Sequence, residues 1–192
     1  FLLLFKRAAL GYQAANKLSL TLGLILLMLG QQKKVLVYFE RIESTEEVVD
    51  IALETTSRLQ EQALSAGVPW CKVYHSLLSD ADRKKVLEDF KQPGPKALLS
   101  CRTLDEGLDI PEVDCAILAA STQSRRQRIQ RIGRVLRKGD GNKRSTIVTL
   151  FVEGSGDENV CAEDHEVFGG PVTMHHTDER SCLSFVQELL TT

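Results

Sequence analysis

The feature that most constrains the fold is the alternation of short apolar runs with longer segments of helical character. Strand-forming residues fill five runs, at 35–39, 71–74, 97–101, 114–119 and 145–152. The first run is apolar at every position, which is typical of a central strand covered by helices on both faces. Strands that alternate with helices through short turns predict right-handed crossovers and an α/β fold, in which a parallel sheet carries helices on both faces.

Polar boundary residues predict where the intervening helices begin and end. Ser44 and Glu47 form a capping box, so we expect a helix from there toward Ala66. Ser79 is placed to cap a second helix that ends near Phe90. Ligands of such sheets collect beyond the carboxyl ends of the strands, so the loops that follow the strands are where chemistry is expected.

The first thirty residues are expected to form a leading helical segment. Leucine and alanine dominate 1–30 and proline is absent, with Gly11 and Gly23 as points where the helix can be interrupted, and Gly30 is expected to end it. The most apolar part, 18–29, is shorter than the roughly 20 residues that a membrane-spanning helix needs. A buried helix is therefore predicted, with no membrane contact.

The composition is that of an ordinary folded domain. Hydrophobic residues make up 43% and charged residues 26% of the 192 positions, and a chain of this length can bury one core. We expect one lobe over 1–152, an acidic, glycine-rich loop over 153–177, and a C-terminal helix over 178–192 that packs on the same domain.

Positive charge is concentrated in one segment, although the formal net charge is only −2. Between Arg125 and Arg144 nine residues are Lys or Arg and only Asp140 is acidic, whereas 145–179 contains neither Lys nor Arg. This balance argues against a protein that coats nucleic acid uniformly and indicates a local basic site instead.

The five cysteines predict reduced thiols rather than a disulfide framework. Their number is odd and no CxxC spacing occurs, which is typical of an intracellular protein. A zinc site is the alternative for the cysteines and histidines near the C-terminus, Cys161, His165, His175, His176 and Cys182. Their spacing matches no standard pattern, so no bound metal is expected.

The basic segment contains a predicted helix, 123–137, with two adjoining faces. At 100° per residue, a stripe about 80° wide carries the polar set Gln127, Gln130, Arg134 and Arg137, and the apolar set Ile129, Ile132 and Leu136 lies beside it. A row of guanidiniums suits bidentate capture of phosphate oxygens. A solvated helix face is the alternative, but Gly133 disfavours it: glycine inside a helix costs about 1 kcal/mol relative to alanine and indicates a close approach to the backbone.

A second segment, 105–111, follows the run 97–101 and so lies at the carboxyl end of that strand. Gly107 permits close backbone approach, Asp109 offers a carboxylate to hydroxyls such as those of ribose, and Pro111 fixes the exit of the chain. Alone this segment indicates only a turn. Together with the predicted basic helix at 123–137, however, it forms a pair of motifs that is far more specific than either one.

These two segments resemble motifs V and VI of superfamily 2 helicases, in the expected order and on the expected elements. The residues E-G-L-D-I-P at 106–111 and Q-R-I-G-R-V-L-R at 130–137 carry the resemblance. The run 35–40 is similar to the motif IV strand of that superfamily. Within it, 104–111 and 121–137 look most like the XPB-type repair helicases, especially their archaeal members.

The resemblance implies a RecA-like lobe, the second of two in an ATP-driven motor related to the P-loop NTPases. In such a lobe Gln130 would contact the nucleotide, and Arg134 and Arg137 would be catalytic arginine fingers on the γ-phosphate. Gly107 and Asp109 would meet the ribose side. The implied cofactors are ATP and Mg²⁺.

The resemblance also implies part of a nucleic-acid track. Cys101 and Arg102 occupy positions that face the nucleic-acid backbone in relatives. Many relatives have Thr where Cys101 stands, and a thiol is a poorer hydrogen-bond donor than a hydroxyl. Arg125 and Arg126 are further candidates for phosphate contacts, with a solvated surface role as the alternative. DNA is the expected partner and RNA the alternative.

The sequence contains no phosphate-binding loop of its own. No Gly-Lys dipeptide occurs, so the G-x-x-x-x-G-K-[ST] loop is absent, and no DExH segment stands at the expected place. Phosphoryl transfer needs that loop and a magnesium-holding carboxylate besides arginine fingers. ATP and Mg²⁺ are therefore expected to be bound mainly by a first RecA-like lobe, in the same or another chain, and this chain alone is expected not to hydrolyse ATP.

The expected function is the second lobe of an ATP-dependent DNA helicase or translocase that acts in DNA repair, inside the cell, in the cytoplasm or nucleoid or in the nucleus. One alternative is the second lobe of a restriction-type translocase or of an RNA helicase. Another is a non-catalytic nucleic-acid-binding or protein-docking module. Retention of both Arg134 and Arg137 disfavours the module, because phosphate binding alone does not require their spacing.

Overall fold

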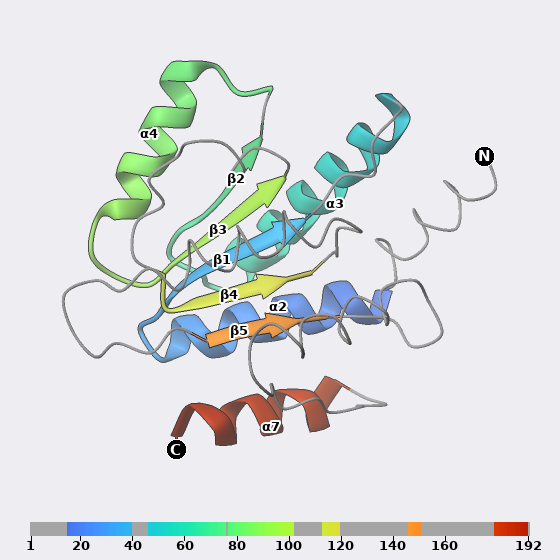
Figure 1. The fold of residues 1–192 in the computed structure, drawn as a ribbon, viewed down its shortest axis with the longest axis vertical. Helices are drawn as coiled ribbons and strands as arrows, with labels where there is room; N and C mark the ends of the chain where they lie inside the picture. Colours follow the sequence, from blue (N-terminus) through green and yellow to red (C-terminus); the bar gives the residue numbers. More distant parts are fainter. Residues whose placement is uncertain are drawn as a thin grey trace, which may run out of the picture.

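The computed structural model describes six stretches of the chain, which form one sheet and the helices around it (Figure 1). The described residues are 15–39, 46–75, 77–101, 113–119, 146–150 and 179–191. The helix predicted at 123–137 and the loop predicted at 153–177 lie outside them. Of the leading helical segment, the structure describes 15–30 as one helix, which continues through Gly23 without the interruption considered there and ends at Gly30.

Five strands form the sheet in the described part of the chain. They are β1 (Lys34–Phe39), β2 (Cys71–His75), β3 (Lys96–Cys101), β4 (Cys115–Leu118) and β5 (Thr146–Thr149). Their order is β2-β3-β1-β4-β5, and every neighbouring pair is parallel. The parallel sheet is thus confirmed, and the run that is apolar throughout is its central strand.

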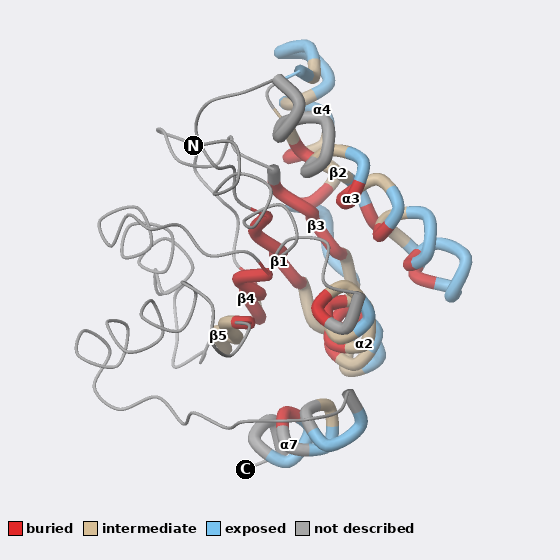
Figure 2. Tube along the Cα trace, turned by 90° about the vertical axis from the view of Figure 1, so that its right-hand side faces the viewer, coloured by how far each residue is buried: buried red, intermediate tan, exposed pale blue. Residues whose placement is uncertain are grey.

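Four helices are described: α2 (Ala15–Gly30), α3 (Glu46–Ser65), α4 (Asp80–Lys91) and α7 (Glu179–Thr191). α2 and α3 lie on one face of the sheet, the α2–α3 face, and α7 packs on α2 (Figure 2). α4 lies on the opposite face, the α4 face, against β2 and β3. The connections through α3 and α4 run in opposite directions across the sheet and lie on opposite faces, as crossovers of one hand must.

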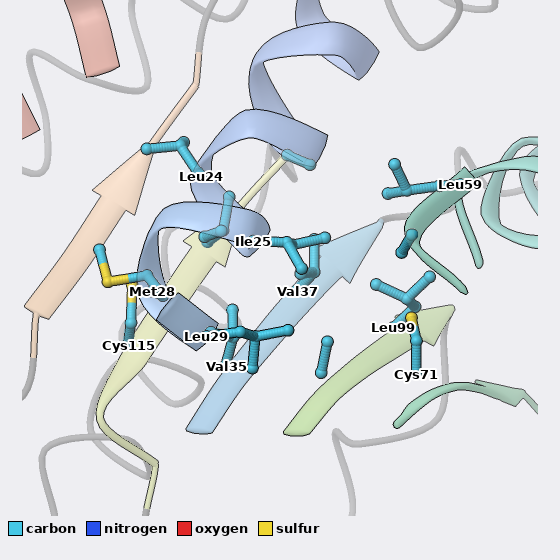
Figure 3. Packing of buried hydrophobic residues seen from close by; sticks show 14 of the residues in the cluster. Leu24, Ile25, Met28, Leu29, Val35, Val37, Leu59, Cys71, Leu99 and Cys115 are labelled. Atoms are coloured by element: carbon cyan, nitrogen blue, oxygen red, sulfur yellow. The ribbon is translucent and has the colours of Figure 1, made fainter. Parts of the chain in front are cut away.

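The core is divided between the two faces by the alternation of side chains along each strand. Val35 and Val37 of β1 join the cluster of the α2–α3 face, where Ile25 and Met28 of α2 are fully buried (Figure 3). Leu36, between the two valines, is buried in the cluster of the α4 face. Burial of one such side chain stabilises the fold by roughly 1.5–3 kcal/mol, so α2 is held as a core helix.

The start of α4 confirms the cap predicted at Ser79. The Ser79 hydroxyl oxygen accepts from the Asp82 N–H at 3.1 Å, and the hydroxyl donates to Asp82 Oδ2 at 2.6 Å. The first bond satisfies a backbone N–H that would otherwise lack a partner at the helix end, and the second holds the hydroxyl in place. The corresponding cap predicted at Ser44 lies outside the described residues, although α3 does begin at Glu46.

Two turns require unusual backbone angles. Gly67, just after α3, has φ +89°, which glycine adopts without steric cost. Gln32 has φ 61° in the turn between α2 and β1, where the Gln32 N–H donates to the Leu29 carbonyl oxygen at 2.9 Å and the Lys33 N–H to the Met28 carbonyl oxygen at 3.0 Å. A side chain at this position is strained, so the turn tolerates Gln32 rather than favouring it.

At the amino-terminal edge of the sheet, two lysines hold the carboxyl end of α4. Lys34 Nζ donates to the Lys91 carbonyl oxygen at 3.0 Å. Lys96 Nζ donates to the Asp89 carbonyl oxygen and lies 5.6 Å from the centroid of the Trp70 ring. Cations are favourable at a helix carboxyl end, where carbonyl groups lack partners. α4 is therefore tied to the first residues of both β1 and β3.

Candidate nucleotide and nucleic-acid site

The carboxyl ends of the strands meet at one edge of the sheet. β1 ends at Phe39, which is in register with Cys101, the last residue of β3. On the other side of β1, Tyr38 is in register with Leu118, the last residue of β4. Ligands of open parallel sheets bind outside this edge.

Both segments that carry the predicted motifs begin at this edge. Segment 102–112 follows β3, and segment 120–145 connects β4 to β5. β3 and β4 are the two neighbours of β1, so their ends are about two strand spacings, or roughly 10 Å, apart. The sheet thus brings together the starting points of two segments that are separate in the sequence.

The connections that leave the strands diverge at the boundary between β1 and β4. The connection that leaves β1 forms α3 and leads toward β2, whereas the connection that leaves β4 leads the other way, to β5. In doubly wound sheets such a switch in direction opens a crevice at the carboxyl edge, and ligands bind there.

The predicted site residues fall almost entirely outside the part of the chain that the structure describes. This holds for Arg134, Arg137, Gln130, Gly107, Asp109, Arg102, Arg125 and Arg126. The remaining one, Cys101, ends β3 and has the backbones of β1 and β2 on either side, at Phe39 and His75. Cys101 is thus the one predicted site residue whose position at the edge the structure describes. The roles of all nine residues stay predictions.

Asp114 positions the start of β4 and was not singled out by the sequence analysis. Its N–H donates to the Lys34 carbonyl oxygen at 3.0 Å, and its carboxylate Oδ2 accepts from the Lys34 N–H at 2.7 Å. These bonds set β4 beside β1 at the amino edge and hence place the carboxyl end of β4, where 120–145 begins. An acid directly before an apolar run is the only local signal for this role.

Burial perturbs two titratable groups near the end of β2. The pKa of Tyr74 is raised, mainly because the side chain is partly buried. The positive charge of Arg83 lowers this pKa, and the negative charge of Asp80 raises it. Burial lowers the pKa of His75, whose Nδ1 is buried and has no hydrogen-bond partner. His75 is the last residue of β2, at the same edge as the ends of β1 and β3.

Among the described residues, no three His, Cys, Asp or Glu side chains gather as a metal ion would require. Of the zinc candidates, Cys182 lies in α7 and the other four lie outside the described residues. A pocket of about 230 Å³ lies between α2 and α3 and is lined by Leu18, Ser19, Leu22, Thr55, Arg58, Leu59 and Gln62. No strand residue lines it. In the described stretches no helix is both long and apolar enough to cross a membrane.

Solved structures with the same architecture identify the class of fold. The C-terminal domain of the DEAD-box protein Dbp5 matches 91% of this chain and 91% of its own length, with a TM-score of 0.64 and 20% identity. The Hef helicase domain of Pyrococcus furiosus matches 77% of this chain and 28% of its own, with a TM-score of 0.53 and 21% identity. The fold is therefore that of a RecA-like helicase lobe.

Sequence comparison then assigns the family. The family described as helicase conserved C-terminal domain matches residues 16–139, and the chain belongs to it. The DNA 3'-5' translocase XPB2 of Sulfurisphaera tokodaii is 30% identical over 85 residues, 44% of this chain and 19% of its own length. The ATP-dependent DNA helicase MPH1 of Kluyveromyces lactis is 45% identical over 82 residues, 42% of this chain and 7% of its own.

These matches confirm the resemblance to superfamily 2 helicases and to their XPB type. The aligned part of this chain spans less than a fifth of the length of either relative. The activities of a whole helicase are therefore proposed for this chain below and do not follow from these matches.

Proposed function

We propose that this chain is the second RecA-like lobe of an ATP-dependent DNA helicase or translocase. Membership of the helicase C-terminal family supports the proposal. So do the names of its relatives, a DNA translocase and an ATP-dependent DNA helicase. The lobe would close on a first RecA-like lobe that holds the phosphate-binding loop.

The observation that carries the proposal is that both motif segments begin at the carboxyl edge of the sheet. Segments 102–112 and 120–145 start on the two strands that flank β1. A ligand in the crevice between β1 and β4 would therefore have one segment on each side. This arrangement suits a nucleotide whose ribose and phosphates must be contacted together.

The hand of the crossovers supports a position for the basic helix. The connection from β4 to β5 advances across the sheet in the same direction as the connection from β2 to β3, which runs through α4. Crossovers are right-handed in nearly all parallel sheets, so 120–145 should lie on the α4 face as well. Buried apolar residues of β1 and β4 on that face, Leu36, Ala116 and Leu118, would then receive the stripe formed by Ile129, Ile132 and Leu136.

With its apolar stripe on the sheet, the basic helix would present its polar stripe at the crevice. Gln130 would contact the nucleotide, while Gly107 and Asp109 would meet the ribose. Arg134 and Arg137 would act on the γ-phosphate, because two planar guanidiniums can stabilise the charge that develops as the phosphoryl group leaves. ATP and Mg²⁺ would be held mainly by the first lobe, since this sequence has no Gly-Lys dipeptide.

The nucleic-acid track would cross the same edge. Cys101 and Arg102, at the end of β3, would contact the backbone, and Arg125 and Arg126 would add phosphate contacts at the end of β4. ATP binding would close the two lobes and hydrolysis would reopen them, which moves one lobe relative to the other along DNA. The proposed process is DNA repair inside the cell, and RNA is the alternative track.

The test is alanine substitution of Arg134 and Arg137 in an enzyme that contains both lobes. An arginine finger contributes about 10³–10⁵ in rate, so either substitution should reduce kcat by that order while ATP affinity falls much less. Arg134→Lys should restore little, because a point charge cannot reach two oxygens at once. DNA-stimulated ATP turnover and nucleotide affinity are the measurements.

Arg125→Ala is the matched control from the same basic segment. It should weaken DNA binding and flatten the salt dependence of that binding, with turnover at saturating DNA largely retained. If both finger substitutions leave turnover within a few-fold of wild type, the stripe is a surface feature. The non-catalytic docking module would then be the better description.

A further inference from the structure

The pocket between α2 and α3, called here the α2–α3 pocket, is not used by the proposed function. Both helices lie on the same face of the sheet (Figure 2). The lining residues of α2 fall within 18–22, and those of α3 fall within 55–62 at the i, i+3, i+4, i+7 spacing of one helix face. The pocket is thus formed by two helix faces that are both present in the described part of the chain.

The exposure of the lining side chains changes from the interior of the pocket to its rim. Leu59 and Thr55 are buried, with exposed fractions of 1% and 5%. Leu18 and Leu22 are half-buried and pack against the core of this face, whereas Arg58 is exposed. The pocket therefore has a mainly apolar interior and a charged group at its rim.

The size of the pocket limits what can fill it. Sites for drug-sized ligands have volumes of roughly 300–1,000 Å³, so a pocket of about 230 Å³ is too small to enclose a nucleotide. An apolar cavity of about 150 Å³ holds one benzene molecule. A single alkyl chain therefore fits, and the three leucines of the lining favour such an apolar group over water.

The charge at the rim selects the polar end of the ligand. Arg58 forms no ion pair within the described stretches, although Glu54 and Glu61 lie four residues before it and three residues after it in α3. A guanidinium can donate two parallel hydrogen bonds to one carboxylate. A doubly charged phosphate would be repelled by the two glutamates, which neighbour Arg58 on the helix surface. A singly charged carboxylate is the better match.

We propose that the α2–α3 pocket binds an aliphatic monocarboxylate. The alkyl chain lies between Leu18, Leu22 and Leu59, and the carboxylate accepts hydrogen bonds from Arg58. The bound molecule bridges α2 and α3, so it stabilises the folded chain by mass action. This site goes beyond the proposed function, because no strand residue lines the pocket and neither nucleotide nor nucleic acid is needed to fill it.

The test titrates the ¹⁵N-labelled 192-residue chain with sodium octanoate and follows the backbone amides by NMR. Amides within 18–22 and 55–62 should shift in a saturable manner. Hexanoate, which is two methylenes shorter, should bind up to about fifteen-fold more weakly, because each buried methylene contributes about four-fold in affinity. Octylammonium, which has the octyl chain and the opposite charge, should not shift these amides.

Substitutions at the rim test the two parts of the pocket separately. Arg58→Gln should raise Kd for octanoate about three- to five-fold, the effect of one exposed ion pair, and Arg58→Lys should retain most of the affinity. Gln62→Trp, which starts from an exposed lining residue and fills the pocket from its rim, should abolish binding. Arg180→Gln is the matched control, because it removes an exposed arginine from α7 and should leave Kd unchanged. Thermal unfolding of each variant checks that the fold is retained.

The outcomes decide for or against the site without reference to the helicase activity. Saturable shifts at 18–22 and 55–62 that weaken with Arg58→Gln and disappear with Gln62→Trp would support it. Octylammonium binding as tightly as octanoate, or an unchanged Kd in Arg58→Gln, would show that the rim charge selects nothing and that the proposal is wrong. Shifts that never saturate, or that saturate only at other residues, would equally overturn it.

Discussion

Lys34 and Asp114 hold the starts of β1 and β4 together through a reciprocal pair of hydrogen bonds, although 80 residues separate them. One bond is an ordinary backbone bond of a parallel ladder. The other uses the Asp114 carboxylate as the acceptor for the first N–H of β1. The carboxyl ends of these two strands, where the connections diverge, are thus aligned by a side chain at the far end of the sheet.

Asp114→Ala should therefore destabilise the fold. It removes the acceptor of a partly buried N–H, and an unsatisfied group of this kind costs about 1–3 kcal/mol. Asp114→Asn should cost clearly less, because the amide oxygen can still accept. Urea unfolding measures both. The control is Glu88→Ala, which breaks an exposed 3.9 Å ion pair with Lys84 and should change stability by no more than a few tenths of a kcal/mol. Equal effects of the three substitutions would contradict the role of Asp114.

Gln32→Gly should stabilise the chain. Gln32 adopts φ 61°, a conformation that costs a side-chain-bearing residue about 1 kcal/mol and glycine very little. The greater freedom of glycine in the unfolded state offsets part of the gain. A rise in the thermal unfolding midpoint of a few degrees is expected, whereas Gln31→Gly, one residue earlier, should lower it. A fall in the midpoint on Gln32→Gly would show that the side chain of Gln32 contributes more than the turn costs.

Cys71 and Cys115 should resist alkylation in the native chain. Burial raises the pKa of each thiol to about 12, and the thiolate is the reactive form. At pH 8 iodoacetamide should label them only after unfolding, which mass-spectrometric peptide mapping can resolve site by site. Labelling of either at the rate of a free thiol would mean that its strand opens readily.

The same two thiols should make stability fall with rising pH. In the unfolded chain the two thiols ionise above about pH 9, the ordinary pKa of cysteine. In the folded chain burial raises their pKa to about 12, so they keep their protons at that pH. The folded state then binds more protons than the unfolded state, so the free energy of unfolding decreases as pH rises. Replacing both cysteines by alanine should remove that part of the slope between pH 9 and 10.

The purified 192-residue chain should not hydrolyse ATP, even with saturating DNA. Its sequence lacks the phosphate-binding loop and the DExH segment that phosphoryl transfer requires. A coupled phosphate-release assay with Mg²⁺ is the measurement. Turnover above background that disappears with Arg134→Ala would place the whole catalytic apparatus in this chain.

The elements that could be predicted from the sequence are those with local causes. β1 is apolar on both faces because each face belongs to a buried core cluster, and α4 begins where Ser79 supplies a cap. Strand neighbours are different, because the pairing of Lys34 with Lys96 in register depends on the whole sheet. The bond that the Asp114 carboxylate accepts from the Lys34 N–H likewise follows from packing between distant segments. The positive φ of Gln32 belongs to a local turn, but a glutamine gives no sequence signal of it. The site motifs are local patterns, and their side-chain roles remain predictions.

The packing of α7 on α2 joins the last described helix to the first. During synthesis α2 leaves the ribosome before α7 exists, so the part of the α2 surface that α7 covers stays open to solvent for that interval. Val186 of α7, 6% exposed in the folded chain, is one of the side chains that finally cover this region. A nascent chain of this kind is a natural client for chaperones that recognise exposed apolar helices. Loss of α7 would leave that part of α2 uncovered.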